Sequence, residues 1–346
     1  MTDRLSPSPR GGEGRGEGQT SRAVWFTAPR KVEVRDAPIA PLPADGLRVR
    51  TEVSAISAGT ELLFYRGELE EGVATDVTLD TAPLKHPFQY GYASVGRVVE
   101  AADGWKHLVG TRVFGFHPHQ EELVGSATSF IPVPLDVSAE AATFLANLET
   151  AVSLVMDGAP LIGERVAVVG HGVVGQLTTA LLTHMGVEQV HVIEPQLERG
   201  VGRLLPRDAR CSITTELTPE LRDSFDLVYE LSGKPEAFDT ALQLARYSGR
   251  VVVGSWYGTR RAPIDLGSRV HRSRISVSFS QVSTIDPRHT PRFDKTRRLQ
   301  VALSWLSRLP LESLITHRVP FAEAARAYEL LDSRQPGVLQ VVLTHR

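Results

Sequence analysis

The sequence predicts an α/β protein in which a β-rich module precedes a doubly wound parallel sheet. Short runs of alternating apolar residues, with Pro and Gly between them, fill residues 23–133. From about residue 140, helical patterns and apolar strands alternate, as they do when helices cover both faces of a parallel sheet. The apolar strand Val166–Val169 runs directly into a glycine-rich turn and then a helix.

The first part of the chain divides into a tail and the β-rich module. Residues 1–21 are rich in glycine, proline and charge, so we expect a disordered tail there. Strands of the module are expected where apolar residues alternate with others, at Leu47–Val53, Ser94–Ala101 and Arg112–Phe116. We place this first domain at residues 22–139.

The turn that follows Val169 has the spacing G-x-G-x-x-G. Its first glycine allows a tight turn, its second lets a pyrophosphate approach the backbone, and its third lets helix and strand pack closely. A helix over Gln176–Met185 and a strand over Gln189–Ile193 complete a βαβ unit. We therefore predict a dinucleotide site that includes Gly170, Gly172, Val174 and Gly175.

Glu194 ends the second strand, about twenty residues after Gly175, where an acidic side chain binds the adenosine ribose. A carboxylate there repels a 2′-phosphate, so NAD(H) is favoured over NADP(H). Arg199 and Arg203 follow Glu194 closely in sequence, so NADP(H) stays an alternative cofactor. The alternative is that Glu194 is an ordinary surface acid at a strand end.

Further strands and helices alternate along the predicted dinucleotide domain, residues 140–299, and beyond it. We expect strands at 226–231, 250–254 and 274–279, a helix with Phe238, Leu242 and Ala245 on one face, and then a helix at 295–307, a strand at 314–320, a helix at 321–331 and a strand at 338–343. Ligands bind at the carboxyl edge of such sheets. Cofactor contacts are therefore predicted for the residues after three strands, with turn formation as the alternative: Ser232, Gly254, Ser255 and Phe279.

Composition and charge narrow the classes of function. The chain has 346 residues, 42% of them hydrophobic, which is enough for two cores. Its formal net charge of −2 and the lack of a basic tract argue against a nucleic-acid partner or an acidic membrane surface. With no membrane-spanning run or secretory pattern, we expect a cytoplasmic protein. The single cysteine, Cys211, can form neither an intramolecular disulfide nor a multi-cysteine zinc site.

Four segments occur in the order typical of one superfamily: Val53–Glu61, Tyr90–Val99, the glycine turn, and Leu314–Ala324. From about Arg22 onward, the chain resembles the medium-chain dehydrogenases/reductases. The resemblance implies that the β-rich domain is a GroES-like barrel completed by residues 300–346. It also implies that residues 140–299 form a Rossmann domain and that the active site lies in the cleft between the two. Thr150 matches the family's nicotinamide-contacting threonine.

The chain departs from the zinc-dependent members of this superfamily. Ala58 stands at the position of their cysteine ligand, Tyr92 at that of their histidine, and Ala93 at that of the next glutamate, while the four-cysteine lobe is absent. Zinc needs about four ligands, so we expect no metal. His86, His117 and His119 offer a substitute zinc site, but the His117-Pro-His119 pair is interpreted as a polar loop.

Without zinc, hydrogen-bond donors must stabilise charge on the substrate oxygen. Tyr92 is the leading candidate, since a phenol donates to the oxygen and serves as a general acid; the alternative is that its ring fills the space of the metal site. Thr60 aligns with the proton-relay hydroxyl, or is a turn hydroxyl, and Leu63 replaces the relay histidine. Glu149 either orients substrate or water, or caps a helix that runs toward Met156.

These features predict a zinc-independent oxidoreductase that moves hydride between NAD(H) and an alcohol or carbonyl of a small molecule. Two alternatives stay open: an enone- or quinone-type C=C reductase, and an inactive dinucleotide-binding protein with a sensing or scaffold role. The Ser57–Glu61 loop and the Gly91-Tyr92 pair also resemble the bacteriochlorophyllide hydroxyethyl dehydrogenase branch, whose substrate is an alcohol. We expect a homodimer.

Overall fold

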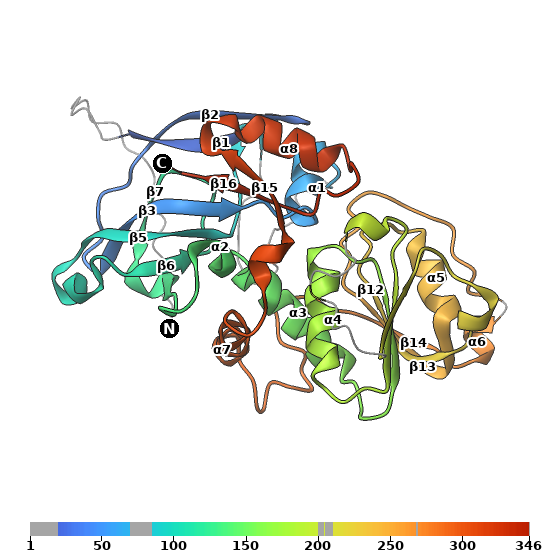
Figure 1. Cartoon of the computed structure of the whole chain (residues 1–346). Coiled ribbons are helices and arrows are strands. Elements are labelled where there is room, and N and C mark those ends of the chain that lie inside the picture. Colours follow the sequence, from blue (N-terminus) through green and yellow to red (C-terminus); the bar gives the residue numbers. More distant parts are fainter. Residues whose placement is uncertain (1–19, 70–84, 200–203, 205–209, 268, 346) are drawn as a thin grey trace, which may run out of the picture.

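The computed structural model describes residues 20–69, 85–199, 204, 210–267 and 269–345. Its strands form three sheets, and helix α3 (Leu145–Gly158) lies between the six-stranded sheet and the other two (Figure 1). The predicted tail falls outside the described residues, except for its last two positions. Thr20 and Ser21 belong to β1 (Thr20–Ala28) because their backbones pair with β2 (Lys31–Pro38), so the ordered chain begins earlier than predicted.

The predicted doubly wound parallel sheet is confirmed. Its strand order is β11-β10-β9-β12-β13-β14, and every neighbouring pair is parallel. The order reverses between β9 and β12, which is where such sheets bind ligands. The strands are β9 (Arg165–Val169), β10 (Gln189–Ile193), β11 (Cys211–Thr214), β12 (Phe225–Glu230), β13 (Ala245–Val253) and β14 (Ser276–Phe279).

Alternate residues of β9 supply two different cores, because successive side chains of a strand point to opposite faces. Val166 and Val168 pack in the core shared with α3, α4 (Val173–Thr183) and α7 (Lys295–Trp305). Ala167 and Val169 pack in the other core, with α5 (Ala237–Leu244) and α6 (Arg269–Arg272). The sheet is therefore covered by helices on both faces.

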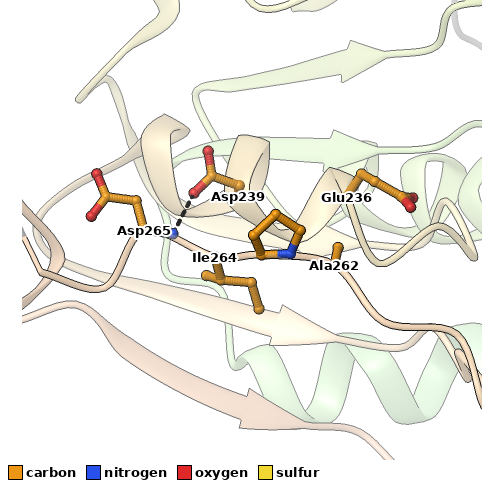
Figure 2. Close-up of a pocket in the computed structure, with 6 residues that line it drawn as sticks. Glu236, Asp239, Ala262, Ile264 and Asp265 are labelled. Atoms are coloured by element: carbon orange, nitrogen blue, oxygen red, sulfur yellow. Dashed lines mark hydrogen bonds between the residues drawn. The ribbon is translucent and has the colours of Figure 1, made fainter.

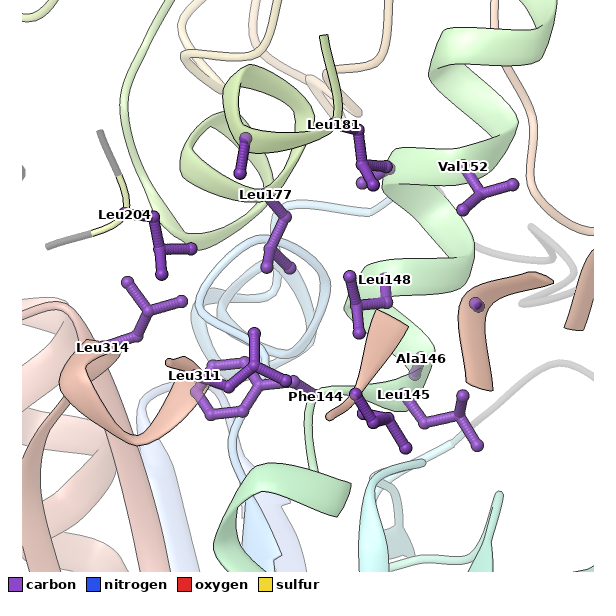
Figure 3. Packing of buried hydrophobic residues seen from close by; sticks show 14 of the residues in the cluster. Phe144, Leu145, Ala146, Leu148, Val152, Leu177, Leu181, Leu204, Leu311 and Leu314 are labelled. Carbon is purple, nitrogen blue, oxygen red and sulfur yellow. The ribbon is translucent and has the colours of Figure 1, made fainter. Parts of the chain in front are cut away.

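The chain after α7 returns across α3 and α4. Leu311 and Leu314, in a 3-10 turn, are buried in the same cluster as Phe144, Leu148 and Leu177 (Figure 3). α7 packs as one helix against α3, although the predicted domain boundary at residue 300 divides it. The 3-10 segments are Asp103–Leu108, Ala127–Ser129, Leu197–Arg199, Pro219–Leu221, Leu311–Leu314 and Phe321–Glu323.

The β-rich part contains a seven-stranded sheet that joins strands from residues 46–132 to strands from residues 315–344. Its order is β15-β16-β3-β5-β6-β8, and β7 also pairs with β3. A second sheet has the order β2-β1-β4. The strands not yet given are β3 (Gly46–Ala55), β4 (Phe88–Gln89), β5 (Ser94–Ala101), β6 (Arg112–Gly115), β7 (Glu122–Ser126), β8 (Phe130–Pro132), β15 (Ile315–Pro320) and β16 (Gln340–Thr344).

Three helices accompany these strands: α1 (Thr60–Arg66), α2 (Ala139–Ala142) and α8 (Ala324–Asp332). The sequence predicted a loop through Glu61, whereas the structure begins α1 at Thr60. Gly67 ends this helix with a φ of 69°, a left-handed conformation that glycine adopts without strain. Thr60 and Arg66 therefore lie at opposite ends of the same short helix, α1.

Candidate active site

The glycine turn after β9 has the close approaches that its sequence predicts. Gly170 has a φ of +97°, and a Cβ there would lie 2.5 Å from Ser232 Cα. A Cβ on Gly175 would lie 2.2 Å from the Gly170 carbonyl oxygen. Neither position has room for a side chain, so the turn can pack against β12 and α4 only with glycine.

The middle of this turn is open. A Cβ on Gly172 would meet no atom within 4 Å. Gly172 is also the N-cap of α4 and supplies no side-chain cap, so the first N–H groups of the helix keep their capacity to bind an anion. Gly172 and Val174 are half-buried, while Gly170 and Gly175 are buried. This arrangement fits a dinucleotide pyrophosphate.

Glu194 directly follows β10, and its carboxylate is directed at the glycine turn. Its Oε2 accepts a hydrogen bond from the His171 N–H at 2.8 Å, and its Oε1 accepts one from the Gln196 N–H at 2.9 Å. The residue is 7% exposed, so the interpretation as an ordinary surface acid is wrong. A carboxylate has further lone pairs for ribose hydroxyls. Arg203 lies outside the described residues, and so does the side chain of Arg199.

The loops after β12 and β13 are tied together by Glu230, which sequence reasoning missed. This fully buried carboxylate accepts hydrogen bonds from the Ser232 N–H at 2.9 Å and from the Tyr257 hydroxyl at 2.5 Å. Burial, together with the Glu230 charge, raises the pKa of Tyr257. The Ser255 hydroxyl oxygen accepts a hydrogen bond from the Gly233 N–H at 2.8 Å, so both serines hold the loops in place.

Three other predicted cofactor residues occupy different environments. A Cβ on Gly254 would lie 2.6 Å from the Cδ2 atoms of Leu154 and Leu231, so these two side chains pack directly against the glycine. Thr150 is half-buried on α3, and its hydroxyl donates to the Ala146 carbonyl at 3.0 Å. Phe279 is 71% exposed at the end of the edge strand β14.

The structure brings Tyr92 and Thr60 together and adds Ser57 to them. The Tyr92 hydroxyl donates to Ser57 Oγ at 2.5 Å. Burial raises the pKa of Tyr92 to about 12, against hydrogen bonds with Ser57 and Thr60 that lower it. The phenol therefore holds its proton at neutral pH and acts as a donor. Ser57 lies in a motif that the sequence singled out, but its hydroxyl was not assigned a role.

Behind Ser57 lies a buried network of charged and polar side chains that sequence reasoning also missed. Glu61 Oε1 accepts a hydrogen bond from the Ser57 N–H at 2.8 Å. Glu61 Oε2 lies 3.0 Å from His119 Nε2 and accepts a bond from the Tyr328 hydroxyl at 2.5 Å. His119 Nδ1 lies 2.8 Å from Ser54 Oγ. Residues 116–119 form a loop, as predicted, but His119 is fully buried in it with both ring nitrogens bonded.

Glu149 lies inside α3, whose N-cap is Phe144, so the capping interpretation is wrong. Its Oε1 instead accepts hydrogen bonds from Arg298 of α7, at 2.9 Å from Nη2 and 3.2 Å from Nε. Arg298 is 1% exposed and also donates to Ser153 Oγ at 3.3 Å and to the Thr284 carbonyl at 2.9 Å. Burial raises the pKa of Glu149, and the Arg298 charge opposes that shift. The structure thus places Glu149 in an ion pair that joins two helices.

A cavity of about 540 Å³ lies apart from these residues, where α5 faces residues 262–265. Figure 2 shows the carboxylates of Glu236, Asp239 and Asp265 around it, with the Asp265 N–H donating to Asp239 Oδ1 at 3.2 Å. None of the predicted catalytic residues lines this cavity.

With the fold and site described, the chain can be compared with known proteins. It is 27% identical over 94% of its length to 2-desacetyl-2-hydroxyethyl bacteriochlorophyllide A dehydrogenase of Cereibacter sphaeroides, and the match covers 98% of that protein. It is 24% identical over 87% of its length to D-guloside 3-dehydrogenase of Escherichia coli K12, of which 93% is covered. No protein-family model matches the chain.

Solved structures share the fold. An alcohol dehydrogenase from Escherichia coli CFT073 complexed with NADH has a TM-score of 0.74 and 18% identity, with 95% of this chain and 100% of that one covered. A putative zinc-binding dehydrogenase from Sinorhizobium meliloti 1021 bound to NADP has a TM-score of 0.75 and 18% identity, with 94% and 100% covered. The chain therefore has the fold of these dehydrogenases and is similar over most of its length to the two curated dehydrogenases. This fold binds dinucleotides in both neighbours.

At the two positions where zinc-dependent relatives would have ligands, Ala58 has no ligand atom in its side chain and the Tyr92 hydroxyl donates to Ser57. The three histidines considered as substitutes have other contacts. His86 packs on Phe88, His117 stacks on Phe130, and His119 belongs to the Glu61 network. Within the described residues, no three His, Cys, Asp or Glu side chains are grouped as a metal site.

Proposed function

We propose that the chain is a zinc-independent oxidoreductase that transfers hydride between NAD(H) and the hydroxyl or carbonyl carbon of a small molecule. The observation that carries this proposal is the Tyr92 hydroxyl, 2.5 Å from Ser57 Oγ, at the position where zinc-dependent members have a histidine ligand. Thr60 bonds to the same phenol, so three hydroxyl groups meet where a substrate oxygen needs a donor.

Tyr92 supplies the proton in this proposal. Its pKa of about 12 keeps the phenol protonated at neutral pH, so it donates to the substrate oxygen when a carbonyl is reduced. In the direction of alcohol oxidation, the same hydroxyl stabilises the developing oxyanion. The Ser57 hydroxyl oxygen accepts the hydrogen bond of Tyr92, which keeps the phenol oriented.

The residues around the glycine turn would hold the dinucleotide. We propose that the α4 N-terminus and Gly172 bind the pyrophosphate, and that Glu194 binds the adenosine ribose and disfavours a 2′-phosphate. Ser232, Ser255 and Thr150 would line the nicotinamide half of the site. When bound, NAD(H) supplies or accepts the hydride. The neighbour with NADP shows that the fold also accepts the phosphorylated cofactor, so the NAD(H) preference rests on Glu194.

Zinc independence is supported by the chemistry of the donor set. Zinc is held by about four nitrogen, sulfur or oxygen ligands. Ala58 supplies none, and the two ring nitrogens of His119 are engaged by Ser54 and Glu61. Glu149 is engaged by Arg298.

We also propose a cytoplasmic homodimer. Val277 is 40% exposed on β14, the edge strand of the parallel sheet, and Phe279 is 71% exposed on the same strand. An exposed apolar edge favours pairing with a second copy. The chain has a single cysteine, Cys211, so it needs no intramolecular disulfide, which suits a reducing compartment. Within the described residues, no helix is long and apolar enough to cross a membrane.

The experiment is a substrate screen with NADH and NAD⁺, read by the absorbance of reduced nicotinamide. The panel contains secondary alcohols, their ketones and α,β-unsaturated ketones. Turnover of alcohol and ketone pairs in metal-free buffer supports the proposal. Turnover of only the unsaturated ketones, or a requirement for added zinc, contradicts it.

A further inference from the structure

A second cavity, of about 550 Å³, is lined by an excess of cations. Six of the ten lining residues are basic: Arg30, Arg66, Lys234, Arg260, Arg261 and Arg334. Three lining carboxylates, those of Glu68, Glu236 and Asp332, leave a formal excess of three positive charges. The lining comes from the β-rich part, at the ends of α1 and α8, and from the loops after β12 and β13.

Charged side chains of decreasing exposure line this cavity, from Arg30 at 59% to Arg66 at 8%. The Arg66 side chain is 8% exposed, and its Nε donates to Asp332 Oδ1 at 2.5 Å. Arg30 pairs with the other oxygen of the same carboxylate. Glu68 Oε2 lies 3.4 Å from Arg260 Nε and 4.0 Å from Arg66 Nη1, and within the described residues it accepts no hydrogen bond. The guanidinium groups of Arg30, Arg66 and Arg260 thus carry three positive charges, whereas the carboxylates that pair with them, those of Asp332 and Glu68, carry two negative charges.

Two further cations at the rim, Lys234 and Arg261, have no acidic partner within the described residues. Neither the Lys234 ammonium nor the Arg261 guanidinium forms an ion pair there, and both residues are exposed. Like charges lining a concave surface focus a positive potential and attract anions. A guanidinium group binds the two oxygens of a phosphate or carboxylate in a planar, bidentate manner. The cavity therefore matches an oxyanion.

We propose that this cavity binds the phosphate or carboxylate group of a small molecule other than the dinucleotide. The site is separate from the α4 N-terminus, which the cofactor pyrophosphate would occupy: no residue of the glycine turn or of α4 lines it. Arg66 and Thr60 stand at the two ends of α1, roughly 9 Å apart along the helix axis. A bound anion is thus one short helix away from the hydroxyl group that bonds Tyr92.

The test is calorimetric titration with inorganic phosphate, in the presence and absence of saturating NADH. The variant Lys234→Gln/Arg261→Gln removes the two unpaired cations, and Arg272→Gln removes an exposed arginine that does not line the cavity. Saturable binding is expected, weakened roughly tenfold or more in the double variant and unchanged in the control. Succinate should compete with phosphate, because both offer a pair of anionic oxygens that a guanidinium group can bind.

Three outcomes overturn the proposal. They are no saturable phosphate binding, equal affinity in the double variant, and loss of phosphate binding on saturation with NADH. The last would mean that the cavity holds the phosphates of the cofactor itself. Circular dichroism of the double variant separates loss of the site from loss of the fold. Because the readout is binding, it is independent of whether the hydride-transfer proposal holds.

Discussion

Glu61 Oε1 accepts a hydrogen bond from the Ser57 N–H at 2.8 Å, so a fully buried carboxylate fixes the backbone of the residue that accepts the hydrogen bond of the Tyr92 hydroxyl. The other oxygen of Glu61 is held by His119 and Tyr328. A carboxylate buried without partners is costly, and here every partner belongs to the β-rich part of the chain. The orientation of the Tyr92 hydroxyl is therefore set before any ligand binds.

Tyr92→Phe separates a catalytic phenol from a ring that only packs. Removing a single well-placed donor typically lowers turnover by roughly 10²–10³, while NADH affinity and thermal stability should stay nearly unchanged. Tyr90→Phe is the matched control, because the two rings are in contact at 6.1 Å between centroids. If Tyr92→Phe keeps most of its turnover on an identified substrate, the donor is Ser57 or Thr60.

Glu194→Ala should narrow the preference for NADH over NADPH, because the repulsion of a 2′-phosphate is lost. Fluorescence titration of the unmutated protein and of the variant with NADH and with NADPH measures this preference. Glu194→Gln keeps the shape and removes the charge, so it distinguishes repulsion from loss of the bond to the His171 N–H. Equal affinities of the unmutated protein for both cofactors would show that Glu194 does not set the choice.

Elemental analysis of the purified, dialysed protein should find no stoichiometric zinc. The reason is that Ala58 and Tyr92 replace two ligands, and the His119 nitrogens are already bonded. Turnover should be unaffected by a chelator. One tightly held zinc per chain would mean that His86, His117, His119 or Glu149 rearranges into a site.

Arg298→Met should destabilise the fold by about 3–5 kcal/mol, since it leaves the buried Glu149 carboxylate without its partner. Burial already raises the folded-state pKa of Glu149, so folding favours its protonated form. That contribution is full below the unfolded pKa of about 4.3 and is lost as pH rises through the higher folded pKa. The deficit of the variant should therefore shrink as the pH is lowered toward this window.

Urea denaturation at several pH values measures the effect, with Glu149→Gln/Arg298→Met as the control because it removes the charge as well. A variant whose deficit does not change with pH would show that the loss comes from packing and not from the unpaired buried charge of Glu149.

Val277→Lys should convert a dimer to a monomer, because it places a charge on the edge strand β14. Light scattering after size-exclusion chromatography reads the mass directly. Val109→Lys is the control, since Val109 is 50% exposed in the β-rich part of the chain. A protein that is monomeric before mutation contradicts the proposed homodimer.

The parallel sheet and the glycine turn could be predicted from sequence because their signals are local. The strand Gln189–Ile193 was predicted with its observed bounds, since an apolar strand between turn residues is recognisable by itself. Helix α1 was missed because its residues Glu61 to Tyr65 are all buried, so it has no polar face and no helical periodicity.

The partners within the site could not be predicted because they are distant in sequence. Glu149 and Arg298 are 149 positions apart, and Glu61 and Tyr328 are 267 apart. Neither residue type nor local spacing indicates which arginine or tyrosine will meet which carboxylate. The family resemblance predicted Tyr92 and Thr60 as site residues. The contact of the Ser57 hydroxyl with Tyr92 was not predicted, because it depends on where α1 begins.

The place of β16 in the seven-stranded sheet sets the order in which the chain can fold. β16 pairs with β15 and also with β3, so Leu343 meets Ser54 across almost the whole length of the polypeptide. During synthesis, the sheet that contains β3 lacks a neighbour at this edge until β16 has been made. All described strands of the parallel sheet lie between Arg165 and Phe279. The parallel sheet can therefore be complete while the seven-stranded sheet still lacks β16.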